Sequence, residues 1–287
     1  MKGHLLAFIA ITIWSLTYIQ TKVLLMYIDP IEIIIVRFSL AWIILWIIHP
    51  KRTPFVLKDE MMFALAGLSM FFGYYVLENI ALLHTTAINA GLLVTLAPLF
   101  TLLTASIIHH TPLPKMALWG ALIAFAGVAV LVFEKISLPN IGDSLALLAG
   151  FGWAVYTLIL GYISTSYHHL AVTRKSIFYG LVFLWLFWET VYSGSFHFEA
   201  YTHPAVLINL ATLTLFASVG AYILWRKAVL LIGSSKTSNY IYLVPLINTT
   251  ASVWLLDEVL GWRIILSSLM ILGGMAIANK PSLQPPE

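Results

Sequence analysis

The sequence predicts an all-α, polytopic membrane protein of ten transmembrane helices, and three observations lead to this prediction. Of its 287 residues, 61% are apolar and only 9% are charged, whereas soluble domains carry about 25% charged residues. The apolar residues gather in continuous runs of about 20, the length that a helix needs to cross the hydrocarbon core of a bilayer. Only helices and closed barrels satisfy every backbone group in lipid, and these runs are too long for barrel strands.

Turn signals between the apolar runs set the limits of the expected spans. Asp29-Pro30, His49-Pro50 and Pro139-Asn140 are typical helix-stop signals, as is Thr111-Pro112. The ten expected spans are Gly3–Met26, Ile31–Ile48, Glu60–Ile80, Ala87–Ile108, Met116–Phe133, Gly142–Ile163, Val172–Tyr192, Pro204–Trp225, Ser238–Leu256 and Trp262–Ala278.

The distribution of Lys and Arg predicts the orientation of these spans. Cytoplasmic loops of membrane proteins carry an excess of both residues. If the N-terminus is cytoplasmic, only Lys22, Lys135 and Arg263 lie at outer ends, Arg37 falls within the second span, and the rest of the 15 basic residues lie inside. We therefore expect both termini to be cytoplasmic. Because the basic residues are scattered among short loops, we expect no nucleic-acid partner.

The two halves of the chain resemble each other. Trp14 in the first span matches Trp153 in the sixth, and Pro98 within the fourth span matches Pro245 within the ninth. Shared apolar composition explains matching leucines more readily than matching tryptophans and prolines, so we interpret the similarity as a duplication. Each half holds five spans, an odd number, and the second half therefore enters the membrane with opposite polarity. Such inverted-topology repeats are common in secondary transporters and place a pathway between the halves.

The two expected five-helix repeats cover residues 1–136 and 137–287, and together they form one integrated membrane domain. Proline removes a backbone hydrogen bond from a helix interior, so Pro98 and Pro245 predict kinks that bow two helices or act as hinges.

Four segments together resemble the EamA-type members of the drug/metabolite transporter (DMT) superfamily. They are residues 6–22 with Trp14-Ser15, residues 30–42 with Arg37-Phe38, residues 81–98, which read ALLHTTAINAGLLVTLAP, and residues 228–274 with Asp257-Glu258. The resemblance implies a central cavity and export of small metabolites, often amino acids, across the cytoplasmic (inner) membrane of a bacterium or archaeon. One difference from the family pattern is His109-His110 in the first repeat, where members often carry an acidic residue.

The third span carries the polar residues that say most about function. Polar groups within the bilayer usually face the interior of the bundle. Tyr74 and Glu78 are four residues apart, as are Tyr75 and Asn79, so each pair shares a helix face. A partly desolvated Glu78 carboxylate is suited to bind a substrate ammonium group or to carry a coupling proton.

Two charged residues have competing interpretations. Glu78 is alternatively an interfacial carboxylate paired with Arg37 or Lys22. Arg37 is suited to hold a substrate carboxylate through two hydrogen bonds, but we favour a structural ion pair that ties two helices together.

Aromatic rings provide the remaining candidates. They line cavities and stack on apolar or aromatic ligands, although many of those in this chain belong to the interfacial belts. The candidate cavity residues are Trp14, Tyr18, Tyr74, Tyr75, Glu78, Asn79, Trp153, Tyr156, Tyr222, Asn239 and Tyr242.

Several function classes have no support in the sequence. There is no cysteine, and adjacent histidines do not share a helix face, so we expect no metal site. No phosphate-binding glycine loop and no common hydrolase motif occurs, so we expect no cofactor and no enzyme. We predict a secondary transporter, monomeric or homodimeric, that exports a small-molecule substrate such as an amino acid by alternating access. The alternatives are a multidrug or cation exporter and a non-transporting membrane subunit, and proton coupling through Glu78 stays open.

Overall fold

The computed structural model describes residues 1–113, 115–132, 140–163, 167–192, 194–232, 237 and 239–278, without the side chains of residues 132, 226 and 239. The expected repeat boundary at residues 136 and 137 lies outside this description. The first half contains α1 (Lys2–Leu24), α2 (Pro30–Ile48), α3 (Leu57–Ala66), the π-helix η1 (Gly67–Tyr74), α4 (Tyr75–His84), α5 (Ala87–Val94), α6 (Ala97–Ile108) and α7 (Lys115–Val132).

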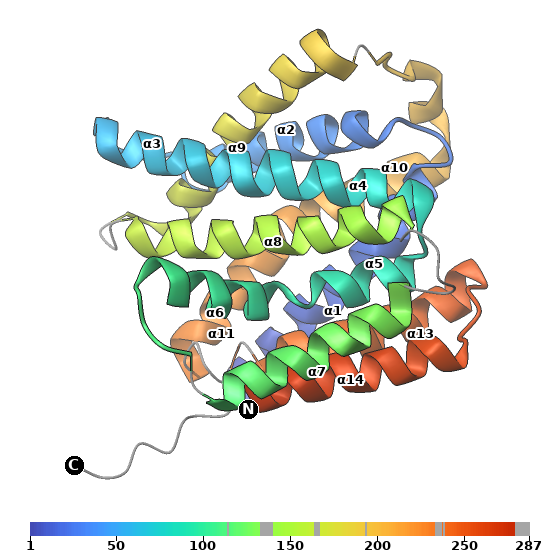
Figure 1. The fold of residues 1–287 in the computed structure, drawn as a ribbon. Coiled ribbons are helices and arrows are strands. Elements are labelled where there is room, and N and C mark those ends of the chain that lie inside the picture. The colour runs from blue at the N-terminus through green and yellow to red at the C-terminus, as the bar shows by residue number, and fades with distance from the viewer. Residues whose placement is uncertain are drawn as a thin grey trace.

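The second half is helical as well (Figure 1). It contains α8 (Ile141–Tyr162), α9 (His169–Phe187), the π-helix η2 (Trp188–Tyr192), the 3-10 helix η3 (Phe198–Thr202), α10 (Pro204–Thr212), the π-helix η4 (Leu213–Gly220), α11 (Ala221–Ile232), the 3-10 helix η5 (Asn239–Leu243), α13 (Val244–Leu256) and α14 (Trp262–Ala278).

The predicted all-α class is confirmed, and the described residues form ten apolar helices that correspond to the expected spans. Within the described residues, seven helices are long and apolar enough to cross a membrane, and three shorter apolar helices complete the set. The third and eighth spans run longer than expected, over Leu57–His84 and Pro204–Ile232. Their ends carry charged residues such as Lys58 and Lys227, which an apolar window excludes although a helix tolerates them.

Short polar residues start several helices where the turn signals predicted. The Asp29 side chain accepts a hydrogen bond from the Ile31 N–H at 2.8 Å, and Pro30 opens α2. Asn140 accepts from the Gly142 N–H at 2.8 Å and starts α8. Such caps satisfy backbone donors that have no partner within the helix.

The two matched prolines begin helices and do not kink continuous ones. The fourth span is interrupted between α5 and α6, and Pro98 lies in the first turn of α6. In the ninth span the 3-10 segment η5 precedes α13, and Pro245 lies in the first turn of α13. Proline is tolerated there because first-turn N–H groups need no helical partner. Their role as hinges stays a prediction.

The two halves interlock in a reciprocal way. Helix α1 of the first half packs on α11 and α13 of the second, and α8 of the second packs on η1, α4, α5 and α6 of the first. Along another edge of the bundle α7 packs on α14 (Figure 1). There the backbones touch, because a Cβ atom added to Gly274 would lie 2.5 Å from the Gly120 carbonyl oxygen.

The bundle is apolar on the outside, as a bilayer requires. Trp254, Leu230 and Leu269 are 82%, 72% and 67% exposed, whereas Glu78 and Arg37 are buried. We call the end that carries Lys22 and Glu258 the outer end, and the end that carries Lys51 the inner end, after the orientation expected from the basic residues.

Candidate functional site

A buried polar cluster forms where the two halves meet, and its centre is the Glu78 carboxylate. The Tyr74 hydroxyl donates to Glu78 Oε1 at 2.7 Å, and the Tyr18 side chain of α1 lies close to the same carboxylate. Glu78 is only 4% exposed. Because the third span continues to His84, Glu78 lies about 9 Å inside the end of its helix, deeper than the sequence suggested.

Arg37 supplies the positive charge of this cluster from α2. Its Nε donates to Ser218 Oγ of η4 at 2.6 Å, and its guanidinium carbon lies 4.9 Å from the centre of the Tyr75 ring. The expected structural ion pair is not among the salt bridges of the described residues. Arg37 and Glu78 are close enough to attract each other electrostatically, but they do not form a salt bridge.

Aromatic rings from both halves enclose these charges. The Trp14 ring centre lies 6.4 Å from that of Trp153, 5.3 Å from that of Tyr222 and 5.4 Å from that of Trp225. The Tyr74 and Trp153 ring centres are 5.4 Å apart. Three of these pairs are edge-to-face and the Trp14–Trp225 pair is tilted. Such contacts hold the rings in place, so rings from four different spans line the cluster.

Most of the predicted cavity residues come together in this cluster. Its members from the sequence analysis are Trp14, Tyr18, Tyr74, Tyr75, Glu78, Trp153, Tyr156 and Tyr222. Nothing in the sequence singles out Ser218, since a single serine in an apolar run is common. Trp225 was considered there only as an end residue of its span.

Two predicted residues, Asn79 and Tyr242, have other partners. The Asn79 Nδ2 donates to the Pro30 carbonyl oxygen at 2.9 Å, because one helical residue beyond Glu78 turns the side chain about 100° away. The Tyr242 hydroxyl donates to the Met275 carbonyl oxygen at 3.3 Å, on the side of α14. The side chain of Asn239 lies outside the described residues.

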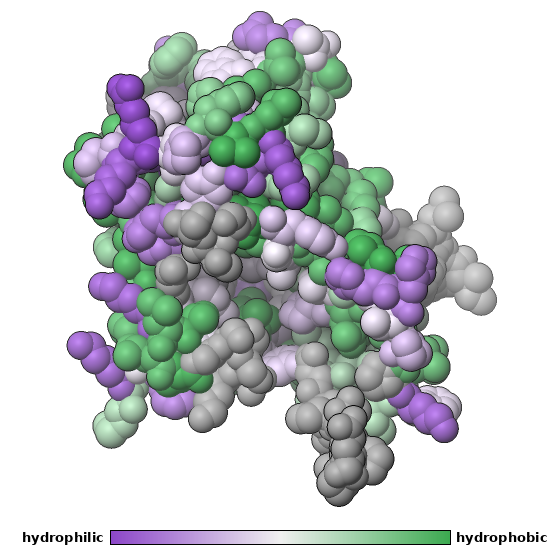
Figure 2. Space-filling view, turned by 90° about the vertical axis from the view of Figure 1, so that its left-hand side faces the viewer, coloured by the Kyte–Doolittle hydropathy of each residue, from purple (hydrophilic) through white to green (hydrophobic). Residues whose placement is uncertain are grey.

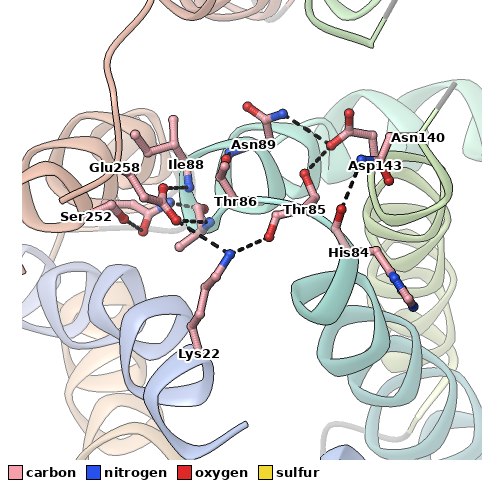
Figure 3. A network of polar contacts seen from close by, with 12 residues as sticks. Lys22, His84, Thr85, Thr86, Ile88, Asn89, Asn140, Asp143, Ser252 and Glu258 are labelled. Carbon is pink, nitrogen blue, oxygen red and sulfur yellow. Dashed lines mark hydrogen bonds and ion pairs between the residues drawn. The ribbon is translucent and has the colours of Figure 1, made fainter. Parts of the chain in front are cut away.

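A second polar assembly closes the outer end of the bundle, and we call it the outer network (Figure 3). Lys22 Nζ of α1 lies 3.7 Å from Glu258 Oε1 and donates to the Thr85 carbonyl oxygen at 2.5 Å. The Glu258 carboxylate also accepts hydrogen bonds from the Ala87 and Ile88 N–H groups, at 2.7 and 3.0 Å. Glu258 from the second half therefore caps α5 of the first.

The turn between α4 and α5 is also held from its other side. The Thr85 hydroxyl donates to Asp143 Oδ1 at 2.5 Å, and the Asn140 Nδ2 donates to the His84 carbonyl oxygen at 2.9 Å. Figure 3 shows Asp143 of α8 and Asn140, which caps the start of α8, facing this turn opposite Glu258. In the outer network, side chains from α1, from the start of α8 and from the segment after α13 therefore all contact the turn between α4 and α5.

Local backbone geometry directs Glu258 toward that turn. Asp257 ends α13 in a left-handed conformation with φ of 54°, which is the usual way to terminate a helix and reverse the chain. In the sequence, Asp257-Glu258 stands out only through the family resemblance, and Lys22 is one expected partner of Glu78. The structure pairs Lys22 with Glu258.

The inner end of the bundle differs from the outer end. Figure 2 looks onto this face, where hydrophilic side chains lie in the upper part and at the edges and the surface is hollowed near the centre. Within the described residues, no group of three or more His, Asp or Glu side chains is placed to hold a metal ion. The site thus consists of a buried charged cluster, a tied outer end and a hollowed inner face.

Comparison with known proteins decides the family. The profile of the EamA-like transporter family matches residues 1–133 and 140–280. The chain belongs to the EamA-like transporter family. This confirms the predicted resemblance, and it makes the protein a multi-pass membrane transporter and not an enzyme.

Individual relatives agree with this assignment. The chain is 30% identical over 268 residues to an uncharacterized transporter of Archaeoglobus fulgidus, with 90% of each protein covered. It is 22% identical to a probable amino-acid metabolite efflux pump of Salmonella typhimurium, over 96% of this EamA-family chain and 94% of the pump. A solved crystal structure with 19% identity superposes with a TM-score of 0.63 and covers 96% of both chains, which shows the fold alone.

Proposed function

We propose that this EamA-family transporter carries an amino acid or a closely related zwitterion through a path between its two halves. The observation that carries the proposal is the buried pair of opposite charges, Glu78 and Arg37, which face one aromatic cluster without forming a salt bridge to each other. Buried charges in a membrane protein are costly and mark substrate pathways.

A zwitterion complements both charges at once. The Glu78 carboxylate would accept hydrogen bonds from the substrate ammonium group. The Arg37 guanidinium, whose Nε donates to Ser218, would bind the substrate carboxylate through its terminal nitrogens. The rings of Trp14, Trp153 and Tyr222 would contact the apolar side chain of the substrate.

The two different ends of the bundle support alternating access. The outer network ties the outer end, while the inner face is hollowed (Figures 2 and 3), and a path open toward the inner end is the arrangement that receives a substrate for export. The reciprocal packing of α1 and α8 and the two matched profile ranges support an inverted repeat whose halves rock against each other. The name of the Salmonella relative supports export, and the basic residues support an inner end in the cytoplasm.

The alternative function is export of lipophilic cations or drugs, which needs Glu78 and the rings but not Arg37. A ligand series separates the two. The melting temperature of the purified protein is measured in the presence of three ligands: an amino acid, the corresponding amine without the carboxylate, and a lipophilic cation. A ligand that binds the native state raises this temperature. We expect the amino acid to stabilise the wild type and to lose this effect in Arg37→Gln, while Lys115→Gln, an exposed cation at the inner end, behaves as wild type.

The amine supplies the internal control. If Arg37→Gln still responds to the amine, its fold and its Glu78 site are intact, and a lost amino-acid response reports on the guanidinium alone. Stabilisation of the wild type by lipophilic cations but by no amino acid would reject the zwitterion proposal in favour of cation export. Uptake of radiolabelled amino acid into proteoliposomes, with and without a pH gradient, would then test whether Glu78 couples protons, since Glu78→Gln removes any gradient dependence that it causes.

A further inference from the structure

A groove lies on the outside of the bundle between α2 and α9, away from the central cluster. It consists of two adjoining depressions of about 390 and 500 Å³ that share Trp42 and Ile43. Arg52 lines the first depression, and residues of α9 such as Trp185 line the second. Helix α9 contacts α2 but leans away from it toward the top of Figure 1, so the two helices diverge along the groove.

The body of the groove is apolar and faces the surroundings. Its residues Ile43, Ile47 and Leu186 are 50%, 74% and 57% exposed. From Ser39 to Ile47 the groove follows α2 for about 12 Å, close to the hydrocarbon depth of one bilayer leaflet, about 15 Å. A single acyl chain of one leaflet therefore fits this length.

The inner end of the groove is cationic. Arg52 lines it, and Lys51 beside it is exposed. Arg174 of α9 lies beneath, with its guanidinium carbon 3.6 Å from the centre of the Trp46 ring and its Nη2 donating to the Lys51 carbonyl oxygen at 2.8 Å. None of these three cations takes part in an ion pair within the described residues.

We propose that this groove binds an anionic phospholipid, with one acyl chain along Trp42 and Ile43 and the phosphate on Lys51 and Arg52. Basic pockets between transmembrane helices on the cytoplasmic side bind anionic head groups, and guanidinium matches phosphate geometry. A second copy of the chain fits less well, because a two-fold interface on this groove would bring Arg52 and Lys51 of both copies together.

Native mass spectrometry of the purified protein tests this site independently of transport. The probes are phosphatidylglycerol and phosphatidylcholine with identical acyl chains. We expect the wild type to bind phosphatidylglycerol more tightly, and Arg52→Gln to weaken that binding about fivefold, which corresponds to about 1 kcal/mol per basic residue at the membrane surface. Lys115→Gln removes the same charge at the same end but on α7, and it should keep the preference.

A second variant tests the apolar part of the site. Ile43→Trp fills the groove, and because Ile43 is half exposed the larger ring can be accommodated without disturbing the core. We expect it to weaken binding of both lipids. The proposal is overturned if the wild type binds the two lipids equally, if Arg52→Gln keeps the preference for phosphatidylglycerol, or if Ile43→Trp leaves lipid binding unchanged. A dimer that Ile43→Trp dissociates would also overturn it.

Discussion

Replacing Glu258 by glutamine should release the outer end of the transporter. In the native protein the Glu258 carboxylate holds Lys22 at 3.7 Å and caps the Ala87 and Ile88 N–H groups. Glutamine has nearly the same shape and keeps one carbonyl oxygen for capping. It removes the charge that attracts Lys22 and the positive end of the α5 dipole.

The size of the effect follows from the exposure of the two partners. The Lys22 side chain is 31% exposed and that of Glu258 is 9% exposed, so solvent screening limits their ion pair to about 1 kcal/mol. Hydrogen bonds to a charged acceptor contribute about 1 kcal/mol more than those to a neutral one. The variant should therefore favour the released outer end by about 2 kcal/mol, or roughly 30-fold in the equilibrium constant.

Cysteine labelling can measure this change because the chain has no native cysteine. Ser252 is fully buried beside the outer network, where its hydroxyl donates to Asn248 Oδ1 at 3.3 Å, and Ser252→Cys alters little else. The rate of maleimide labelling should follow the population of the released state and rise roughly 30-fold in the Glu258→Gln background. The control is Glu199→Gln, which removes an exposed carboxylate from η3 and should leave the rate unchanged.

The labelling experiment also has a clear negative outcome. If Glu258→Gln labels within twofold of the parent while its melting temperature is unchanged, the outer network does not hold the end closed. Lys22→Met should raise the rate as well, and the double variant should gain less than the sum of the two effects, because both changes break the same interaction.

Two further predictions concern stability. Gly274→Ala places a Cβ atom 2.5 Å from the Gly120 carbonyl oxygen, so it should destabilise the α7–α14 contact by about 1–3 kcal/mol and lower the melting temperature, whereas Gly273→Ala, whose Cβ meets nothing within 4 Å, should not. The pKa of Tyr201 is raised mainly by burial and also by the 2.6 Å hydrogen bond that its hydroxyl donates to Glu32. The neutral phenol is therefore the form that the native state favours, and its stabilisation is complete below about pH 10 and is lost as pH rises toward the native pKa. Tyr201→Phe should lower the melting temperature at neutral pH and flatten its alkaline decline, and an unchanged alkaline slope would contradict this assignment.

The sequence predicted a large part of the central cluster because helical periodicity is a local property. Tyr74 and Glu78 are four residues apart and share a face whatever surrounds them, and Trp14 and Trp153 could be paired through the repeat. Asn79 was assigned to the wrong partners because a pattern of polar residues does not say which of two adjacent positions faces the centre. Arg37 was expected in an ion pair, and it binds Ser218, 181 residues away in the chain.

What the sequence by itself determined is the set of ten spans, since each apolar run is driven into lipid by its own transfer free energy and satisfies its own backbone hydrogen bonds. Membrane insertion of a span does not depend on contacts with other helices, so the composition and length of each apolar run are enough to predict it. Only the tertiary structure decided that Glu258 caps α5 and pairs with Lys22, and that Glu78 and Arg37 share one cluster without touching. Those contacts join segments from different spans, and their free energy exists only once the helices have packed against one another.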